Sequence, residues 1–231
     1  MADIAAILFD KDGTLFDFDA TWGAWARDVT FDLAEGDAEL AGRLARAIGY
    51  NLAAGHFERH SPVIAGTVAE VAELIAPHLP GRSIAALVRD LDAAACRAPQ
   101  VAAVDLTCCL GGLKAAGLRL GVATNDSESS ARAQLEREGV HGFFDFIAGY
   151  DSGFGGKPEP GQLLAFAQAV GVLPAQVAMV GDSLHDMAAA RAAGMRAVAV
   201  LTGPAVAETL APAADVVLPT IDGLADWLAG G

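Results

Sequence analysis

The first fifteen residues constrain the fold of this chain more than any other stretch. Residues 4–9 form an apolar run of strand length, and Asp10 and Asp12 follow directly, with Gly13 and Thr14 behind them. A short and continuously apolar run is typical of a buried parallel strand, and α/β proteins bind ligands beyond the carboxyl ends of such strands. The segment therefore predicts a parallel sheet with chemistry at the end of its first strand.

The two neighbouring carboxylates indicate a divalent cation. Asp10 and Asp12 repel each other unless one keeps its proton or a cation lies between them, and oxygen ligands favour a hard divalent ion. Gly13 permits a tight turn that leaves the backbone open to a ligand. A plain strand followed by an Asp-Gly turn is the alternative for this tetrad alone. A calcium loop is excluded, because it needs glutamate at its twelfth position, where Thr21 stands.

Composition narrows the choice of partners. The chain has 231 residues, 53% of them hydrophobic, and its 15 Lys+Arg against 29 Asp+Glu give a formal net charge of −14. This length fits one large domain or a core with a smaller insertion, and the charge argues against a nucleic acid or an anionic membrane as partner. Without a membrane-length apolar run or a basic leader, we expect no membrane partner and a cytoplasmic protein, with its three cysteines reduced.

Two patterns divide the chain. Up to residue 99, alanines at helical spacing predict helices and no convincing strand. These helices are expected at 21–34, 38–53, 67–76 and 83–96. Beyond residue 99, helices and strands alternate. The expected helices are 106–116, 128–138, 161–170, 184–193 and one from 223, and the expected strands are 118–123, 146–148, 177–180, 197–201 and 216–218.

Alternating helices and strands are typical of a parallel sheet that is covered by helices on both faces. We therefore predict an α/β fold, a Rossmann-like doubly wound parallel sheet with an inserted α-helical cap domain. The core domain would comprise residues 1–15 and 100–231. The cap domain would comprise residues 16–99 and would lie over the end of the first strand.

Polar residues also follow later strands of the predicted sheet. These residues are Thr124 and Asn125 after the second strand, Lys157 before a helix, and Asp182 and Asp186 after the fourth strand. Taken singly, each has a plain alternative as a helix cap, a turn residue or a solvated lysine. The glycines before Lys157 form no nucleotide loop, because proline follows the lysine where serine or threonine is required. Their joint occurrence in order is hard to explain by caps and turns.

With these motifs in place, the chain resembles the haloacid dehalogenase-like hydrolase superfamily, and most of all its phosphoglycolate-phosphatase-like members with a helical cap. The matching motifs are Asp10-Lys11-Asp12-Gly13-Thr14-Leu15, Thr124-Asn125, Lys157-Pro158 and Gly181-Asp182-Ser183-Leu184-His185-Asp186. The resemblance implies an enzyme, a Mg²⁺-dependent phosphatase that hydrolyses a small phosphorylated metabolite through an aspartyl-phosphate. Lys11 and Asp126 depart from the residues that many relatives carry, although neither change removes a catalytic group.

The resemblance implies a role for each matched residue. Asp10 would be the nucleophile, and Asp12 would protonate the leaving alcohol and then deprotonate water. Thr124 and Lys157 would hold the transferring phosphoryl oxygens, with Asn125 in the same phosphate-binding set. Phosphoryl transfer suits such an arrangement, since positioning and charge neutralisation supply most of the acceleration.

The same resemblance implies the metal ligands and places substrate specificity in the cap. Mg²⁺ would be held by Asp10, the backbone carbonyl of Asp12, Asp182 and, through water or Lys157, Asp186. In the cap, Arg59 is a candidate contact to an anionic substrate. His56 and His60 stand four residues apart but lack the His-Glu-x-x-His pattern, so we expect structural or exposed roles for both.

Two alternative functions stay open at this point. A phosphomutase of the same superfamily would exclude water and return the phosphoryl group to a sugar. A non-catalytic protein that binds a phosphorylated metabolite would keep the fold without turnover, although the intact motifs argue against it. The natural substrate, and the choice between monomer and homodimer, are not decided by the sequence.

Overall fold

The computed structural model describes residues 4–58 and 60–230, and its centre is a six-stranded sheet. The strands are β1 (Ala6–Phe9), β4 (Arg119–Ala123), β5 (Phe146–Ala148), β6 (Val177–Gly181), β7 (Arg196–Val200) and β8 (Val216–Leu218). They lie in the order β5-β4-β1-β6-β7-β8, and every neighbouring pair is parallel. The predicted α/β fold with a parallel sheet is confirmed, and its first strand lies between β4 and β6.

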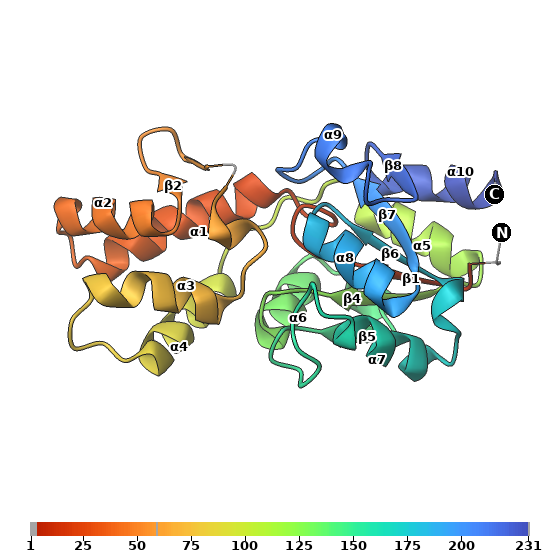
Figure 1. Cartoon of the computed structure of the whole chain (residues 1–231), viewed down its shortest axis with the longest axis horizontal. Helices are drawn as coiled ribbons and strands as arrows, with labels where there is room; N and C mark the ends of the chain where they lie inside the picture. Colours follow the sequence, from red (N-terminus) through yellow and green to blue (C-terminus); the bar gives the residue numbers. More distant parts are fainter. Residues whose placement is uncertain (1–3, 59, 231) are drawn as a thin grey trace.

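Helices cover both faces of this sheet (Figure 1). One face packs against α5 (Leu106–Ala115), α6 (Glu128–Arg137) and α10 (Leu224–Ala229), and the other against α7 (Gly161–Val170), α8 (Leu184–Ala193) and α9 (Ala207–Leu210). Successive side chains of β1 alternate between the two hydrophobic clusters, because a strand points them to opposite faces. Both clusters are apolar, so the strand is apolar at every position.

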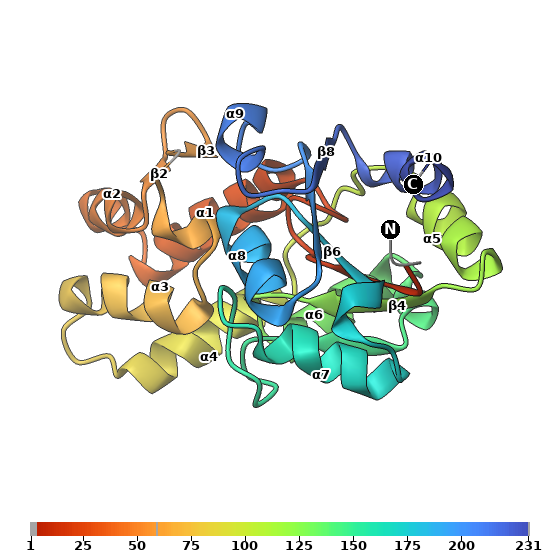
Figure 2. The same cartoon turned by 45° about the vertical axis from the view of Figure 1, so that its right-hand side comes forward.

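The remaining α-helices form a second lobe at one end of the sheet, which we call the cap lobe, and the rest of the chain is called the core. The cap lobe is drawn in red to yellow in Figure 1, and the rotated view of Figure 2 shows it at the same end. They are α1 (Phe18–Leu33), α2 (Ala38–Ala47), α3 (Val68–Ile75) and α4 (Ile84–Ala95). Their buried side chains make a hydrophobic cluster of their own, which runs from Phe18 to Ala98. The division into a cap domain of residues 16–99 and a core domain stays a prediction. Within the described ranges, no helix has the length and apolarity that a membrane span requires.

The predicted helix 38–53 is wrong in its second half. Helix α2 ends at Ala47, and β2 (Tyr50–Asn51) then pairs antiparallel with β3 (His56–Phe57). Gly49 ends the helical path, since its φ of 67° lies in the left-handed region that favours glycine. Strands of two residues carry no alternation of apolar and polar side chains, so this hairpin leaves no periodic signal in the sequence.

Helix α6 of the core holds the end of cap helix α4. Gln134 Nε2 donates a hydrogen bond to Ala95 O at 2.9 Å, and Arg137 Nη1 donates to Ala98 O at 2.8 Å. Ala95 is the last residue of α4, and the last carbonyls of a helix have no partner within the helix, so a side chain from another element can bind there. Ala98 lies in the segment that follows α4. These two bonds join the cap lobe to α6, in addition to the chain connections between the two parts.

Asp92, near this contact between α4 and α6, should make the stability of the fold depend on pH. It lies on α4, and burial raises its pKa to about 6, with the carboxylates of Asp126 and Asp151 adding to the shift. The folded state thus binds this proton more tightly than the unfolded chain does. The free energy of unfolding should therefore fall as pH rises between about 4 and about 6, and the effect should be complete above that range.

Asp92→Asn is expected to raise the melting temperature at neutral pH by about 2 °C and to leave it unchanged near pH 4. The asparagine keeps the shape of the side chain and removes the charge that the folded state disfavours. Thermal unfolding measured across this pH range tests the prediction, with Asp32→Asn, an exposed position of α1, as the control. If both variants changed the melting temperature by the same amount at every pH, the prediction would be contradicted.

Candidate active site

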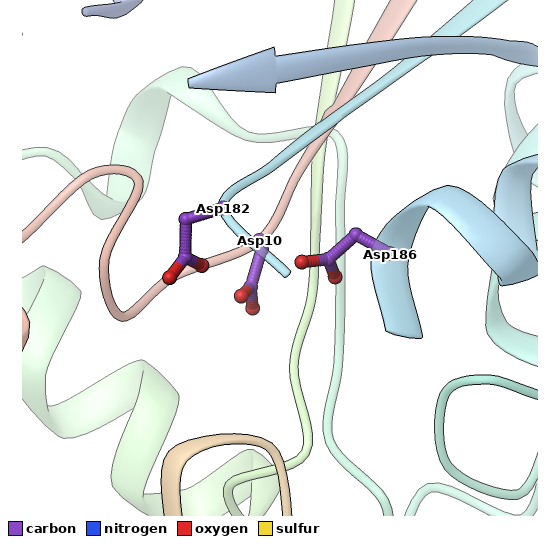
Figure 3. Close-up of side chains that lie close together, drawn as sticks. All are labelled: Asp10, Asp182 and Asp186. Carbon is purple, nitrogen blue, oxygen red and sulfur yellow. The ribbon is translucent and has the colours of Figure 1, made fainter. Parts of the chain in front are cut away.

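Three carboxylates meet at the edge of the sheet where β1 and β6 end. Asp10 follows β1, Asp182 follows β6, and Asp186 lies in the first turn of α8. Ligand atoms of the three lie within 4.8 Å of one another, and Figure 3 shows the side chains pointing toward one another. Because β1 and β6 are parallel neighbours, their carboxyl ends deliver these groups to the same place. We call these three residues the acidic cluster.

Lys157 supplies a cation to this cluster. Its Nζ lies 2.7 Å from Asp10 Oδ1 and 2.7 Å from Asp186 Oδ1, with only 3% of the side chain exposed. The backbone N–H of Lys11 donates to the same Asp10 oxygen at 2.7 Å. Burial opposes the charge of the ammonium, but the flanking carboxylates raise the pKa of Lys157 above its usual range. Lys157 is therefore a fixed positive charge against one oxygen of Asp10.

The acidic cluster has the properties of a metal site. Burial raises the pKa of Asp10 to about 7 despite the Lys157 ammonium, and burial with the neighbouring carboxylates raises the pKa of Asp182 well above its usual range. In residues 4–58 and 60–230, no basic side chain forms an ion pair with Asp182. A Cβ on Gly13 or Gly203 would overlap its carboxylate. A divalent cation would balance this closely packed excess of negative charge, so the three aspartates could hold a metal.

Asn125 holds the loop that carries Lys157. Its Oδ1 accepts a hydrogen bond from the Lys157 N–H at 2.8 Å, and its Nδ2 donates to Lys157 O and to Ala65 O, each at 2.8 Å. Thr124 lies beside it at the end of β4, buried, with Oγ1 accepting from the Asp126 N–H at 3.1 Å. Both residues thus lie at the predicted edge of the sheet. Their contacts to a phosphate group stay predictions.

Asp12 pairs with Lys11 rather than with the acidic cluster. Lys11 Nζ lies 2.6 Å from Asp12 Oδ2 and 3.3 Å from Asp126 Oδ2, and it also donates to Gln134 Oε1. The ammonium lies 5.5 Å from the ring centroid of Trp22 on cap helix α1, within the range of a cation–π contact. Lys11 is wholly buried. The two departures from the family pattern are therefore partners in one buried ion pair, which the sequence analysis missed.

Lys11→Met is expected to destabilise the fold by on the order of 3 kcal/mol, because Asp12 and Asp126 would lose their cation inside the protein. Urea unfolding measures this loss. The matched control is Lys114→Met, whose partly exposed ion pair with Asp145 should contribute about 1 kcal/mol or less. Equal losses of unfolding free energy in the two variants would show that the buried ion pairs of Lys11 stabilise the fold no more than an ion pair at the surface.

A cavity lies between the strand ends and the cap lobe. Asp10, Asp12 and Lys157 line it from the core, and three aromatic side chains of α1 line it from the cap. These side chains are Phe18, Trp22 and Trp25. Their spacing of four and three residues places them on one face of the helix, a signal that the sequence contains and that our sequence analysis did not use. The cavity is therefore lined both by the predicted catalytic residues and by residues of the cap lobe.

The remaining candidates of the sequence analysis lie elsewhere or outside the description. His56 and His60 are exposed and do not line this cavity, in agreement with the exposed roles expected of them. Arg59, the candidate contact to an anionic substrate, lies outside the described residues. His185 lines the cavity from the exposed start of α8, next to the acidic cluster.

Comparison with known proteins gives a consistent result. A family model for haloacid dehalogenase-like hydrolases matches residues 4–194. The phosphoglycolate phosphatase of Chromobacterium violaceum is 43% identical over 122 residues, which cover 53% of this chain and 54% of that protein. The phosphoglycolate phosphatase of Rhodospirillum rubrum is 40% identical over 119 residues, which cover 52% of this chain and 49% of that protein. The chain thus spans about half the length of the curated relatives that it matches.

The fold likeness extends over nearly the whole chain. The crystal structure of a predicted phosphoglycolate phosphatase from Haemophilus somnus 129PT matches with a TM-score of 0.77 and 19% sequence identity. The match covers 98% of this chain and 99% of that structure. At this identity the comparison shows a shared fold.

Proposed function

Because this chain belongs to the haloacid dehalogenase-like hydrolases, we propose that it is a Mg²⁺-dependent phosphatase acting on a small phosphorylated metabolite through an aspartyl-phosphate. The observation that carries the proposal is the position of Lys157, 2.7 Å from both Asp10 and Asp186, beside a buried Asp182. The relatives named phosphoglycolate phosphatase support a small phosphate monoester as substrate.

In the proposed first half-reaction, a carboxylate oxygen of Asp10 attacks the phosphorus while the bond to the leaving alcohol oxygen breaks. Oδ1 is held by Lys157 and by the Lys11 N–H, whereas Oδ2 has no hydrogen bond or ion pair with the described residues and is the oxygen open to substrate. Asp12, whose carboxyl group lies 2.6 Å from Lys11 Nζ, acts here in its protonated form and gives that proton to the departing alcohol.

In the second half-reaction, water attacks the aspartyl-phosphate and the bond between phosphorus and Asp10 breaks. Asp12 accepts the proton of that water, so both aspartates return to their starting states when phosphate leaves. Lys157 and Thr124 hold the phosphoryl oxygens in both steps. The proposed cap, residues 16–99, limits the access of bulk water to the site.

The metal of this proposal would be held by the acidic cluster together with the backbone carbonyl of Asp12. When bound, Mg²⁺ supplies positive charge that offsets the repulsion between a phosphate dianion and the carboxylates. Lys157 alone cannot offset the charge of several carboxylates and a phosphate. We therefore expect Asp182, which has no basic partner in the part of the chain that the structure describes, to contribute most to metal affinity.

Hydrolysis of an aryl phosphate is expected to stop when EDTA removes the metal and to resume when Mg²⁺ is added. Asp182→Asn should raise the Mg²⁺ concentration for half-maximal activity by at least about tenfold, with Asp145→Asn, a surface variant, as control. Full turnover in EDTA would contradict the metal assignment. In an assay with sugar phosphates, isomerisation without release of phosphate would identify a phosphomutase, and binding without turnover would identify a non-catalytic binding protein.

A further inference from the structure

The cavity between core and cap has a charged floor and an apolar roof. The strand ends place Asp10, Asp12 and Lys157 at the floor. The cap side chains that line the roof include Phe18, Trp22, Trp25, Val63, Ile64 and Val71. A phosphate group held at the floor would direct the rest of the substrate, its leaving alcohol, toward this roof. The roof would therefore contact the alcohol part of the substrate.

The described lining of the cavity offers no uncommitted lysine or arginine for a second anionic group. Lys157 is the only such residue among the described residues that line it, and its ammonium already lies 2.7 Å from Asp10 and from Asp186. His185, the other basic residue of the lining, lies at the exposed edge. A carboxylate pressed against the apolar roof would lose its hydration without gaining a counter-ion, and it would face the carboxylates of the floor.

The roof contains one polar group without a partner among the described residues. Trp25 is only 3% exposed, and its indole Nε1–H makes no hydrogen bond with residues 4–58 or 60–230. Buried donors are nearly always paired, and the Trp25 side chain lines the cavity, so a bound molecule is a possible source of the acceptor for this N–H. The ring of Trp25 also packs edge to face against Trp22, with centroids 5.2 Å apart, which fixes its place in the roof.

We propose that the preferred substrate is the phosphate monoester of an uncharged alcohol with an apolar body and a hydrogen-bond acceptor, and that Trp25 is the residue that recognises this acceptor. The proposal rests on the proposed phosphatase function and names its substrate class. It separates this chain from the substrate in the name of its relatives, since phosphoglycolate carries a carboxylate beside its phosphate.

The test compares pairs of substrates that differ in charge and hardly in size. The pairs are phosphoglycolate with its neutral amide, and 4-carboxybenzyl phosphate with 4-carbamoylbenzyl phosphate. Release of phosphate by the wild-type chain with Mg²⁺ gives kcat/KM for each. The amide should be preferred over the acid by at least about tenfold in both pairs, and the benzyl pair should be preferred over the glycolate pair.

Trp25→Phe keeps an aromatic ring and removes the indole N–H. It should lower kcat/KM for 4-carbamoylbenzyl phosphate about fivefold and leave unsubstituted benzyl phosphate nearly unchanged. The control is Trp227→Phe, a tryptophan of α10 that does not line the cavity and should change neither value. Equal loss on both substrates in Trp25→Phe would overturn the role of the indole donor.

Two further outcomes separate the inference from the function on which it rests. A preference for the acids, with phosphate released, would overturn the substrate class while the phosphatase function stands, and loss of that preference in Arg59→Gln would identify the cation responsible. Release of no phosphate from any compound, a simple aryl phosphate included, would overturn the phosphatase function and the inference together.

Discussion

Asp10→Asn is expected to lower kcat by at least about 10³-fold with any phosphate monoester, because the amide cannot attack phosphorus and form the covalent intermediate. The variant should lower kcat and kcat/KM by the same factor, since the bond between Asp10 and phosphorus forms only in the transition state and not in the bound substrate complex. Steady-state phosphate release measures both. This is the largest effect that we predict, because Asp10 is the only residue to which the proposed reaction assigns a bond to phosphorus.

The fold of Asp10→Asn should survive. Burial raises the pKa of Asp10 to about 7, so the native environment already disfavours a full charge at this position. Thermal unfolding should therefore show a cooperative transition close to that of the wild type. A folded variant that keeps kcat within about tenfold of the wild type would remove Asp10 as the nucleophile.

Lys157→Met is expected to have the second largest effect, and it acts on both activity and stability. Turnover should fall by about 10²–10³-fold, the usual loss when one fixed positive donor to the reacting group is removed. Stability should fall by about 3–5 kcal/mol, because the carboxylates of Asp10 and Asp186 would share a buried site without the ammonium between them.

A double variant separates these two effects. Lys157→Met combined with Asp186→Asn removes one of the two stranded charges, so it should recover part of the lost stability and none of the lost turnover. Urea unfolding and phosphate release on the same preparations give both quantities. Recovery of turnover together with stability would mean that Lys157 acts only on the fold.

The strand ends were predictable because local chemistry and sheet topology agree there. The apolar run before Asp10 predicted a strand covered on both faces, and β1 has this environment. Once the strands are parallel, their carboxyl ends share one edge, so the meeting of Asp10 with Asp182 follows from topology alone. The order of the motifs along the chain, together with the parallel sheet, was therefore sufficient to predict this part of the site.

The buried pairing of Lys11 could not be predicted in the same way. Its partner Asp126 stands in the turn after another strand, and only the packing of α6 against the cap brings Gln134 and Trp22 to the same ammonium. Such contacts depend on the relative placement of helices, which no local period encodes. The close approach of Gly203 to Asp182 has the same origin, since a loop beyond β7 supplies it.

The central claim is that Asp10 carries the phosphoryl group between substrate and water. Its most direct test mixes Asp12→Asn protein with Mg²⁺ and an aryl phosphate, whose leaving group departs without protonation, and quenches the mixture in acid for peptide mass spectrometry. The account predicts one added phosphoryl group on Asp10 that is absent when Asp10→Asn is combined with the same change. Turnover without any labelled protein, or a phosphoryl group found on another residue, would contradict it.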